Sequence, residues 1–161
     1  MDNNFKDLPK SYWLDSTPDT NYPSLEEDIN VDIVIIGGGL AGLNIAYLLQ
    51  KEGLKITILE ADRICKGTTA YTTAKITSQH GLIYGKIQGK FGDEIASLYG
   101  KANETAIKMY EDIINKNQID CDFIYESAFV FTQDDKYMEK IEDEVEIASN
   151  IGIDAFYVDE I

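Results

Sequence analysis

A glycine-rich turn between a short apolar run and a helix-like segment constrains the fold of this chain most strongly. The turn is Gly37-Gly38-Gly39-Leu40-Ala41-Gly42, which fits the pattern G-x-G-x-x-G. The run before it, residues 32–36, is rich in Val and Ile and is predicted to be a buried strand. Residues 40–51 are predicted to form a helix that ends near Gly53, because glycine readily adopts the conformation that terminates helices.

A second strand is predicted directly after this helix, and it ends at an acidic residue. Residues 55–59 alternate polar and apolar side chains, and Glu60 follows them. Glu60 stands 23 residues after Gly37, close to the ~20 residues expected in a dinucleotide-binding fingerprint. A strand, a helix and a strand in so short a stretch form a βαβ unit with parallel strands. The expected fold class is therefore α/β with a Rossmann-like nucleotide-binding unit.

The glycines of this turn each have a physical role in holding a pyrophosphate. Gly37 permits the tight turn out of the strand, and Gly39 leaves the backbone open to the phosphates. Gly42 allows the helix to pack closely against the strand. The first N–H groups of the helix, at Leu40 and Ala41, are expected to be unpaired at the positive end of the helix dipole, where they would face the phosphates.

Glu60 is expected to accept hydrogen bonds from the hydroxyl groups of an adenosine ribose. A carboxylate at this place repels a 2′-phosphate, so NADP is not expected. Two other interpretations stay open at this point. One is a glycine-rich turn that binds nothing, and the other is a methyltransferase site, whose glycine loop usually lacks the third glycine in the helix. The fingerprint by itself does not separate FAD from NAD.

The rest of the chain is predicted from proline content and hydrophobic spacing. Residues 1–30 contain all three prolines and are expected to be an extended lead-in, pinned to the domain by Tyr12, Trp13 and Leu14 rather than leaving the Trp exposed. The later elements are expected to be a long helix over 91–113, strands at 123–125 and 129–131, a helix over 137–148 and a last strand at 155–158. Gly100 is the expected weak point of the long helix, and Asp134 or Asp135 is expected to cap the helix over 137–148.

Charge and composition exclude several classes of partner. The net charge is −15, with 14 basic against 29 acidic residues, so nucleic acid and anionic membrane surfaces are not expected as partners. The apolar run 33–49 is interrupted by three consecutive glycines and by Asn44, so no membrane span is expected. Cys65 and Cys121 do not form a disulfide framework, and a single histidine provides no metal-ligand cluster. A cytoplasmic location is expected.

Several segments resemble the opening of the FAD-dependent amino-acid and amine oxidoreductases, the family of D-amino acid oxidase, glycine oxidase and sarcosine oxidase. They are the glycine turn, Leu59-Glu60-Ala61-Asp62-Arg63 and Gly67-Thr68-Thr69. Ser11-Tyr12-Trp13-Leu14 and residues 72–81 resemble a bacterial branch of γ-glutamylputrescine-oxidase-like proteins, some of whose relatives carry a C-terminal Rieske iron–sulfur domain. The Cys/His pairs of a Rieske domain are absent from this sequence.

The resemblance implies FAD as the cofactor and extends the set of residues expected to contact it. Gly67, Thr68 and Thr69 would line the diphosphate or ribityl part, whereas Thr73 and Ala74 would approach the flavin. An ordinary capped loop is the alternative for the threonines. The complete expected set is Gly37, Gly39, Leu40, Ala41, Gly42, Glu60, Ala61, Arg63, Gly67, Thr68, Thr69, Thr73 and Ala74.

No residue is assigned a catalytic role. His80 is the only histidine, and without a nearby carboxylate or nucleophile pattern it is expected to be structural. Cys65 is expected to be a small packed residue. Some relatives bond flavin covalently through a histidine where this chain has Tyr71, so the FAD is expected to be dissociable.

The resemblance also implies the reaction and the extent of the chain. The complete protein would oxidise the CH–NH bond of an amino acid or amine by hydride transfer to flavin. Alternatives are the nucleotide-binding domain of an NAD-dependent dehydrogenase and a catalytically inert nucleotide-binding fragment. The family's substrate-binding residues lie further along, so we expect an incomplete, inactive N-terminal part of a two-domain flavoprotein. Its expected divisions are a lead-in at 1–30, an FAD-binding portion at 31–118 and the start of a substrate domain at 119–161. An incomplete sheet would expose an apolar edge, so self-association is expected.

Overall fold

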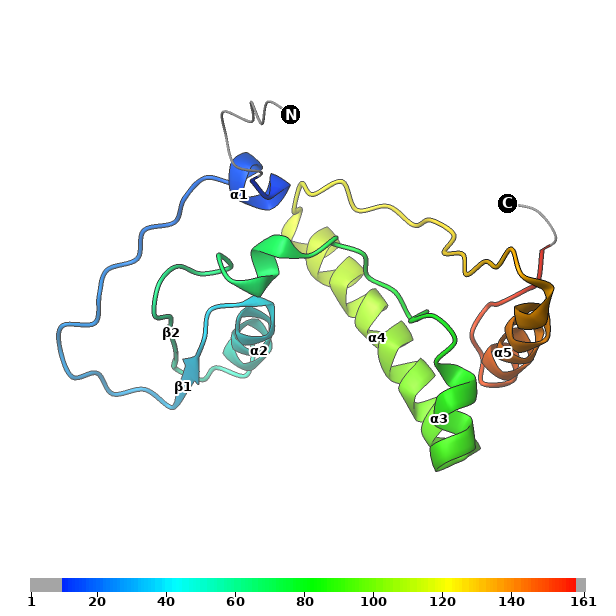
Figure 1. The fold of residues 1–161 in the computed structure, drawn as a ribbon. Coiled ribbons are helices and arrows are strands. Elements are labelled where there is room, and N and C mark those ends of the chain that lie inside the picture. Colours follow the sequence, from blue (N-terminus) through cyan, green and yellow to red (C-terminus); the bar gives the residue numbers. More distant parts are fainter. Residues whose placement is uncertain (1–9, 159–161) are drawn as a thin grey trace, which may run out of the picture. The chain divides into compact units, whose positions relative to one another are not determined.

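The structure is a computed structural model that describes residues 10–158 (Figure 1). It divides between Lys75 and Ile76 into two compact units, each described by itself below. Residues 1–9 of the predicted lead-in and residues 159–161 of the predicted third division lie outside the described part of the chain.

The first unit contains a small parallel sheet with a helix between its two strands. Strand β1 (Ile33–Ile36) is followed by helix α2 (Leu40–Gln50) and strand β2 (Ile56–Leu59). The strands pair in parallel, with Ile33 opposite Ile56 and Ile36 opposite Leu59. This arrangement confirms the predicted strand–helix–strand unit and the α/β class.

One face of this sheet is covered by α2 and the other is open. Ile35 points toward α2, since its Cγ2 atom lies 3.3 Å from the place that a Cβ on Gly42 would occupy. Val34 and Ile36 alternate with Ile35 and are 50% and 89% exposed. Alternate side chains of a strand point to opposite faces, so these two belong to the uncovered face. The prediction that this strand is buried is therefore wrong for that face.

Over residues 10–30 the lead-in is extended except for one short helix, α1 (Tyr12–Ser16), which contacts the 3-10 helix η1 (Thr68–Tyr71). The indole N–H of Trp13 donates to the Thr72 carbonyl at 2.8 Å, so Trp13 is pinned to the first unit as expected. The expectation that Trp13 avoids solvent is wrong, because its side chain is 38% exposed. Its polar edge bonds a loop backbone, which leaves part of the ring in water.

In its described part, residues 76–158, the second unit consists of helices with irregular connections. Its elements are α3 (Tyr84–Phe91), α4 (Asp93–Asn117), the 3-10 helix η2 (Asp135–Tyr137) and α5 (Met138–Asn150). Tyr84, Ala96 and Ala148, from α3, α4 and α5, are its buried apolar residues.

The predicted helix over 91–113 is confirmed as α4, but its start is corrected. Phe91 belongs to α3, and Gly92 separates the two helices with a φ of +85°. That φ lies outside the helical region and suits glycine, so the chain turns there. Gly100 is also not a weak point. A Cβ on it would lie 3.2 Å from Ile151 and 3.4 Å from Tyr84, so the missing side chain permits close packing.

The strands predicted at 123–125, 129–131 and 155–158 are wrong, because the structure has no regular element at these residues. A strand requires a partner for its N–H and C=O groups, and apolar composition alone does not supply one. Ile124, Phe131 and Phe156 are accordingly exposed. The predicted helix over 137–148 is confirmed as α5. Asp134 acts as the cap of η2, where its carboxylate accepts the Lys136 N–H.

Candidate cofactor site

The glycine turn joins the end of β1 to the start of α2. Gly37 has a φ of +103°, a conformation that strongly favours glycine. Its N–H donates to the Leu59 carbonyl at 2.8 Å, which continues the pairing of β1 with β2 into the turn. A Cβ on Gly37 would meet no atom within 4 Å, so open space lies beside its backbone.

The helix begins so close to this turn that a side chain is excluded at Gly42. A Cβ there would lie 2.1 Å from the Gly37 carbonyl oxygen. Gly39 is the N-cap residue of α2 and provides no side-chain cap. Ala41 is the second residue of α2 and is exposed. The predicted roles of Gly37 and Gly42 in the turn and in helix packing are therefore supported by the geometry.

Gly38 is a constrained position that the G-x-G-x-x-G pattern leaves unspecified. A Cβ on Gly38 would lie 2.7 Å from the Ile64 side chain and 3.3 Å from Glu60 Cβ. The Gly38 N–H donates to Glu60 at 2.7 Å, and its carbonyl accepts the Cys65 N–H at 2.9 Å. In the sequence, the run of three consecutive glycines indicates that this position requires glycine.

Glu60 lies directly against the turn, as the spacing predicts. One carboxylate oxygen accepts the Gly38 N–H, and the other accepts the Asp62 N–H at 3.1 Å. The hydrogen bond from Gly38, followed by that from Asp62, holds the pKa of Glu60 below its ordinary value. Each carboxylate oxygen has two lone pairs, so both can accept a further hydrogen bond from a ligand hydroxyl.

The first N–H group of α2 has a hydrogen-bond partner, contrary to the expectation from the sequence. The Leu40 N–H donates to the Thr69 Oγ1 atom at 3.0 Å, so the expectation that this N–H is unpaired is wrong. Thr69 comes from η1, 29 residues further along the chain. A hydroxyl can supply such a cap from a distant segment, and local sequence rules do not anticipate it. Thr69 is thereby brought to the glycine turn.

The other residues that were expected to contact FAD belong to the same unit and differ in the contacts they make. Arg63 donates to the Thr20 carbonyl of the lead-in at 3.2 Å. Gly67 is the N-cap residue of η1, and a Cβ on it would meet no atom within 4 Å. The other members are exposed at the surface of the first unit; these are Ala61, Thr68, Thr73 and Ala74.

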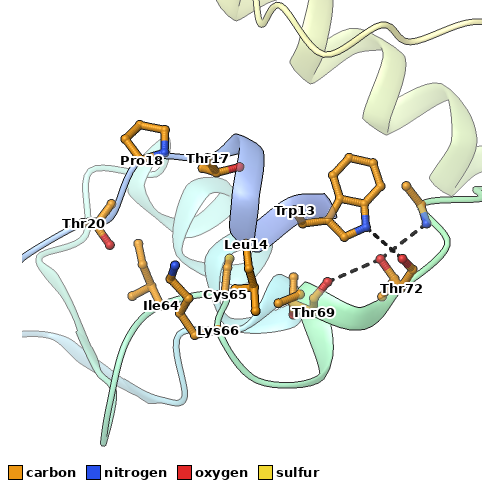
Figure 2. A pocket seen from close by; sticks show the side chains of 12 residues that line it. Trp13, Leu14, Thr17, Pro18, Thr20, Ile64, Cys65, Lys66, Thr69 and Thr72 are labelled. Atoms are coloured by element: carbon orange, nitrogen blue, oxygen red, sulfur yellow. Dashed lines mark hydrogen bonds between the residues drawn. The ribbon is translucent and has the colours of Figure 1, made fainter. Parts of the chain in front are cut away.

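A cavity of about 380 Å³ lies between the lead-in and the loop that carries η1 (Figure 2). Its walls include Trp13 and Leu14 from the lead-in and Cys65 and Thr69 from the loop. Burial raises the pKa of the Cys65 thiol, so Cys65 carries little thiolate at neutral pH. This agrees with its expected role as a packed residue.

His80 belongs to the second unit. Its Nε2 atom lies 3.4 Å from the Asn103 side-chain oxygen, and its ring meets Tyr99 edge-on with centroids 6.3 Å apart. These contacts join the exposed side chain of His80 to α4. They support the structural interpretation over a catalytic one.

The residues of the first unit fit an anionic dinucleotide. Backbone without side chains faces open space at Gly37 and Gly67, and a charged carboxylate stands beside the turn at Glu60. Because Gly42 has no Cβ, the start of α2 can lie directly against the turn. This combination provides an approach for phosphates and an acceptor for ribose hydroxyls.

Comparison with known proteins gives consistent matches. The family described as FAD dependent oxidoreductase (DAO) matches residues 32–160. A Bacillus subtilis protein whose name describes it as a Rieske 2Fe-2S iron-sulfur protein is 40% identical over 92% of this chain and 29% of its own length. Gamma-glutamylputrescine oxidoreductase of Escherichia coli is 27% identical over 78% of this chain and 29% of its own length. Flavin-containing amine oxidase B of Cavia porcellus is 34% identical over 49% of this chain and 14% of its own length.

The chain spans about a third of the length, or less, of these curated relatives. No solved structure gives a significant match. Within residues 10–158, no helix is both long enough and apolar enough to cross a membrane.

Proposed function

The chain belongs to the family of FAD-dependent oxidoreductases, and from this premise we propose that it forms the FAD-binding N-terminal portion of an enzyme that oxidises the CH–NH bond of an amino acid or amine. FAD is the cofactor of the family. The NAD-dependent alternative is disfavoured by the same membership.

The observation that carries the proposal is the contact between the glycine turn and Glu60, where the Gly38 N–H donates to the Glu60 carboxylate. We assign the pyrophosphate to the turn formed by Gly37, Gly39 and Gly42, with the α2 N-terminus at Leu40 and Ala41 beside it. The crowding at Gly42 and the open space at Gly37 support this assignment. The turn, α2 and the parallel strands would then act as a Rossmann-like unit.

Glu60 would accept hydrogen bonds from the adenosine ribose. Its lowered pKa supports this role, because an ionised carboxylate is purely an acceptor. Ala61 and Arg63 follow it in the same loop and would lie along the adenosine. Arg63 bonds the lead-in at Thr20, so its contribution to FAD would be the position of the loop.

The loop around η1 would hold the middle of the cofactor. Thr69 already bonds the start of α2, which supports a position beside the diphosphate for Gly67, Thr68 and Thr69. Thr73 and Ala74 would lie nearer the flavin. The exposed surfaces of Thr68, Thr73 and Ala74 are compatible with contacts to a bound molecule.

When bound, FAD supplies an acceptor for the hydride removed from the carbon that bears the amine. The residues of this chain would bind and orient FAD, and the substrate is proposed to be a small amine or amino acid. The names of gamma-glutamylputrescine oxidoreductase and of flavin-containing amine oxidase B support this substrate class. None of the described residues is assigned a catalytic role.

The organisation of the complete protein is part of the proposal. We propose a lead-in at 1–30, an FAD-binding portion at 31–118 and the start of a substrate domain at 119–161. The share of each curated relative that the chain covers supports the view that further residues complete the site. A cytoplasmic location is proposed from two free cysteines and the acidic charge.

The experiment is a visible absorption spectrum of the purified chain after incubation with FAD and desalting. A parallel sample receives riboflavin, which lacks the adenosine diphosphate half. We expect flavin bands to survive desalting with FAD and not with riboflavin, and we expect ADP to compete with FAD. If the chain is folded by circular dichroism but takes up neither compound, the same test on the full-length protein decides the matter: FAD retained there shows that the site needs further residues, and no FAD retained there contradicts the proposal.

A further inference from the structure

The lead-in is tied to the loop of the candidate FAD site at four places. Each tie joins a residue between 11 and 20 to a residue between 63 and 72. They are a hydrogen bond from the Ser11 hydroxyl to the Ala70 carbonyl, one from Trp13 to Thr72, one from Arg63 to Thr20, and an ion pair between Asp19 and Lys66. The lead-in therefore acts as a strap along this loop.

Trp13 has a direct link through the loop to the start of α2. Its indole N–H donates to the Thr72 carbonyl at 2.8 Å. The Thr72 hydroxyl donates to the Thr69 carbonyl at 3.3 Å, and the Thr69 hydroxyl accepts the Leu40 N–H at 3.0 Å. Figure 2 shows the bonds from Trp13 to Thr72 and from Thr72 to Thr69. One side chain of the lead-in thus helps to fix the segment that reaches the glycine turn.

The loop that carries η1 is largely exposed and includes residues in unfavourable backbone conformations. Most of residues 67–75 are exposed, with Ala70 the buried exception. Cys65 and Ala74 have φ values of +59° and +56°, which are unfavourable for residues other than glycine. A conformation with two such residues persists only when surrounding contacts maintain it. The contacts from the strap supply part of that restraint, beside the hydrogen bonds within the loop and the bond from the Cys65 N–H to the Gly38 carbonyl.

We propose that Trp13 is a positioning residue for FAD, which acts through Thr72 and Thr69 on the shape of the cofactor loop. The inference rests on the proposed function, since it assumes that this loop contacts FAD. The polar edge of the indole is the decisive group. Its apolar face lines the cavity beside the loop and would be retained by phenylalanine, whereas the N–H would be lost.

The test compares the wild-type chain with Trp13→Phe and with Tyr22→Phe as a matched control. Tyr22 is an exposed aromatic residue of the same lead-in and lies beyond the four ties, which involve residues 11–20. Three quantities are measured: hydrogen exchange of the amides of residues 68–75 without FAD, the Kd for FAD from flavin fluorescence, and the visible circular dichroism of the flavin at saturating FAD.

We expect Trp13→Phe to speed exchange in residues 68–75 and leave exchange in α4 unchanged. Loss of one hydrogen bond should weaken FAD binding about three- to tenfold. The flavin circular dichroism should change even at saturation, because the loop would hold the cofactor differently. Tyr22→Phe should leave all three quantities unaltered.

The other outcomes separate the two proposals. A wild-type chain that binds no FAD overturns the proposal that this portion binds FAD by itself, and this inference with it. A wild-type chain that binds FAD while Trp13→Phe has the same Kd and circular dichroism overturns only the role of Trp13. Faster exchange throughout the chain in Trp13→Phe would also overturn it, because the residue would then serve general folding.

Discussion

At the scale of single residues, Glu60 follows β2 and accepts two backbone hydrogen bonds, one from the Gly38 N–H of the glycine turn and one from the Asp62 N–H of its own loop. These bonds favour the ionised carboxylate and lower its pKa. A group whose pKa is lower in the folded state stabilises the fold above its unfolded pKa. That contribution is lost as the pH falls through the folded value.

We therefore predict that Glu60→Gln is less stable than wild type at pH 7 and that the difference shrinks below about pH 4.5. Glutamine retains one oxygen acceptor and cannot serve both N–H groups equally well. Urea unfolding at pH 7, 5 and 3.5 measures the difference. Glu52→Gln, an exposed carboxylate after α2, is the control. A difference that is independent of pH would contradict the role given to the charge.

A second prediction at this scale concerns Gly42. Its Cβ would lie 2.1 Å from the Gly37 carbonyl, so Gly42→Ala must displace α2 or the turn. We expect a loss of about 1–3 kcal/mol in the free energy of unfolding and loss of FAD retention after desalting. Gly89→Ala is the matched control, since a Cβ there meets no atom within 4 Å. This control should be neutral or stabilised by about 0.5–1 kcal/mol.

At the scale of elements, the second unit depends on a contact between two helices. The Glu144 carboxylate of α5 accepts the N–H groups of Tyr84 and Gly85 at 2.7 and 2.8 Å. These N–H groups belong to the first turn of α3 and have no partner within their own helix. A helix of eight residues is marginal alone, so this cap from α5 is expected to hold α3 in place.

We predict that Glu144→Ala costs about 1–3 kcal/mol in the free energy of unfolding, because it leaves the buried Tyr84 N–H and the partly buried Gly85 N–H without an acceptor. Glu144→Gln should cost less, since its amide oxygen can still accept. Glu142→Ala, on the exposed side of α5, should have little effect. Denaturation followed by circular dichroism, together with hydrogen exchange in α3, measures these effects. Equal losses for Glu144→Ala and Glu142→Ala would show that the cap contributes nothing.

At the scale of the whole molecule, apolar exposure and negative charge oppose each other. The open face of the sheet carries Val34 and Ile36, and large apolar residues are also exposed in the second unit. A two-stranded sheet is marginal without a further covering element. The net charge of −15 repels another copy of the chain.

We predict that the chain self-associates and that association strengthens with salt, because salt screens the repulsion between copies. Sedimentation velocity at about 50 and 500 mM NaCl should show a larger mean mass at the higher salt, where the Debye length is several-fold shorter than at low salt. Val34→Thr, on the open face, should reduce association. Ile35→Thr, facing α2, should instead lower stability. A monomer at both salt concentrations would contradict the prediction.

The sequence by itself determined the parts of this protein that depend on neighbouring residues. The alternation of apolar residues, the spacing of the glycines and the distance to Glu60 predicted β1, α2 and β2. The same reasoning predicted that Glu60 lies against the glycine turn. These features are local, since strand and helix periodicity and the conformational freedom of glycine act over a few residues.

Only the tertiary structure decided the features that join distant segments. The Thr69 hydroxyl at the start of α2, the Trp13 bond to Thr72 and the Glu144 cap of α3 each join residues at least 29 positions apart. The strands expected near residues 123–131 did not form, because a strand is stabilised by a partner and not by its own composition. Hydrogen-bond partners are chosen by the packed chain, where every buried donor must find an acceptor within reach.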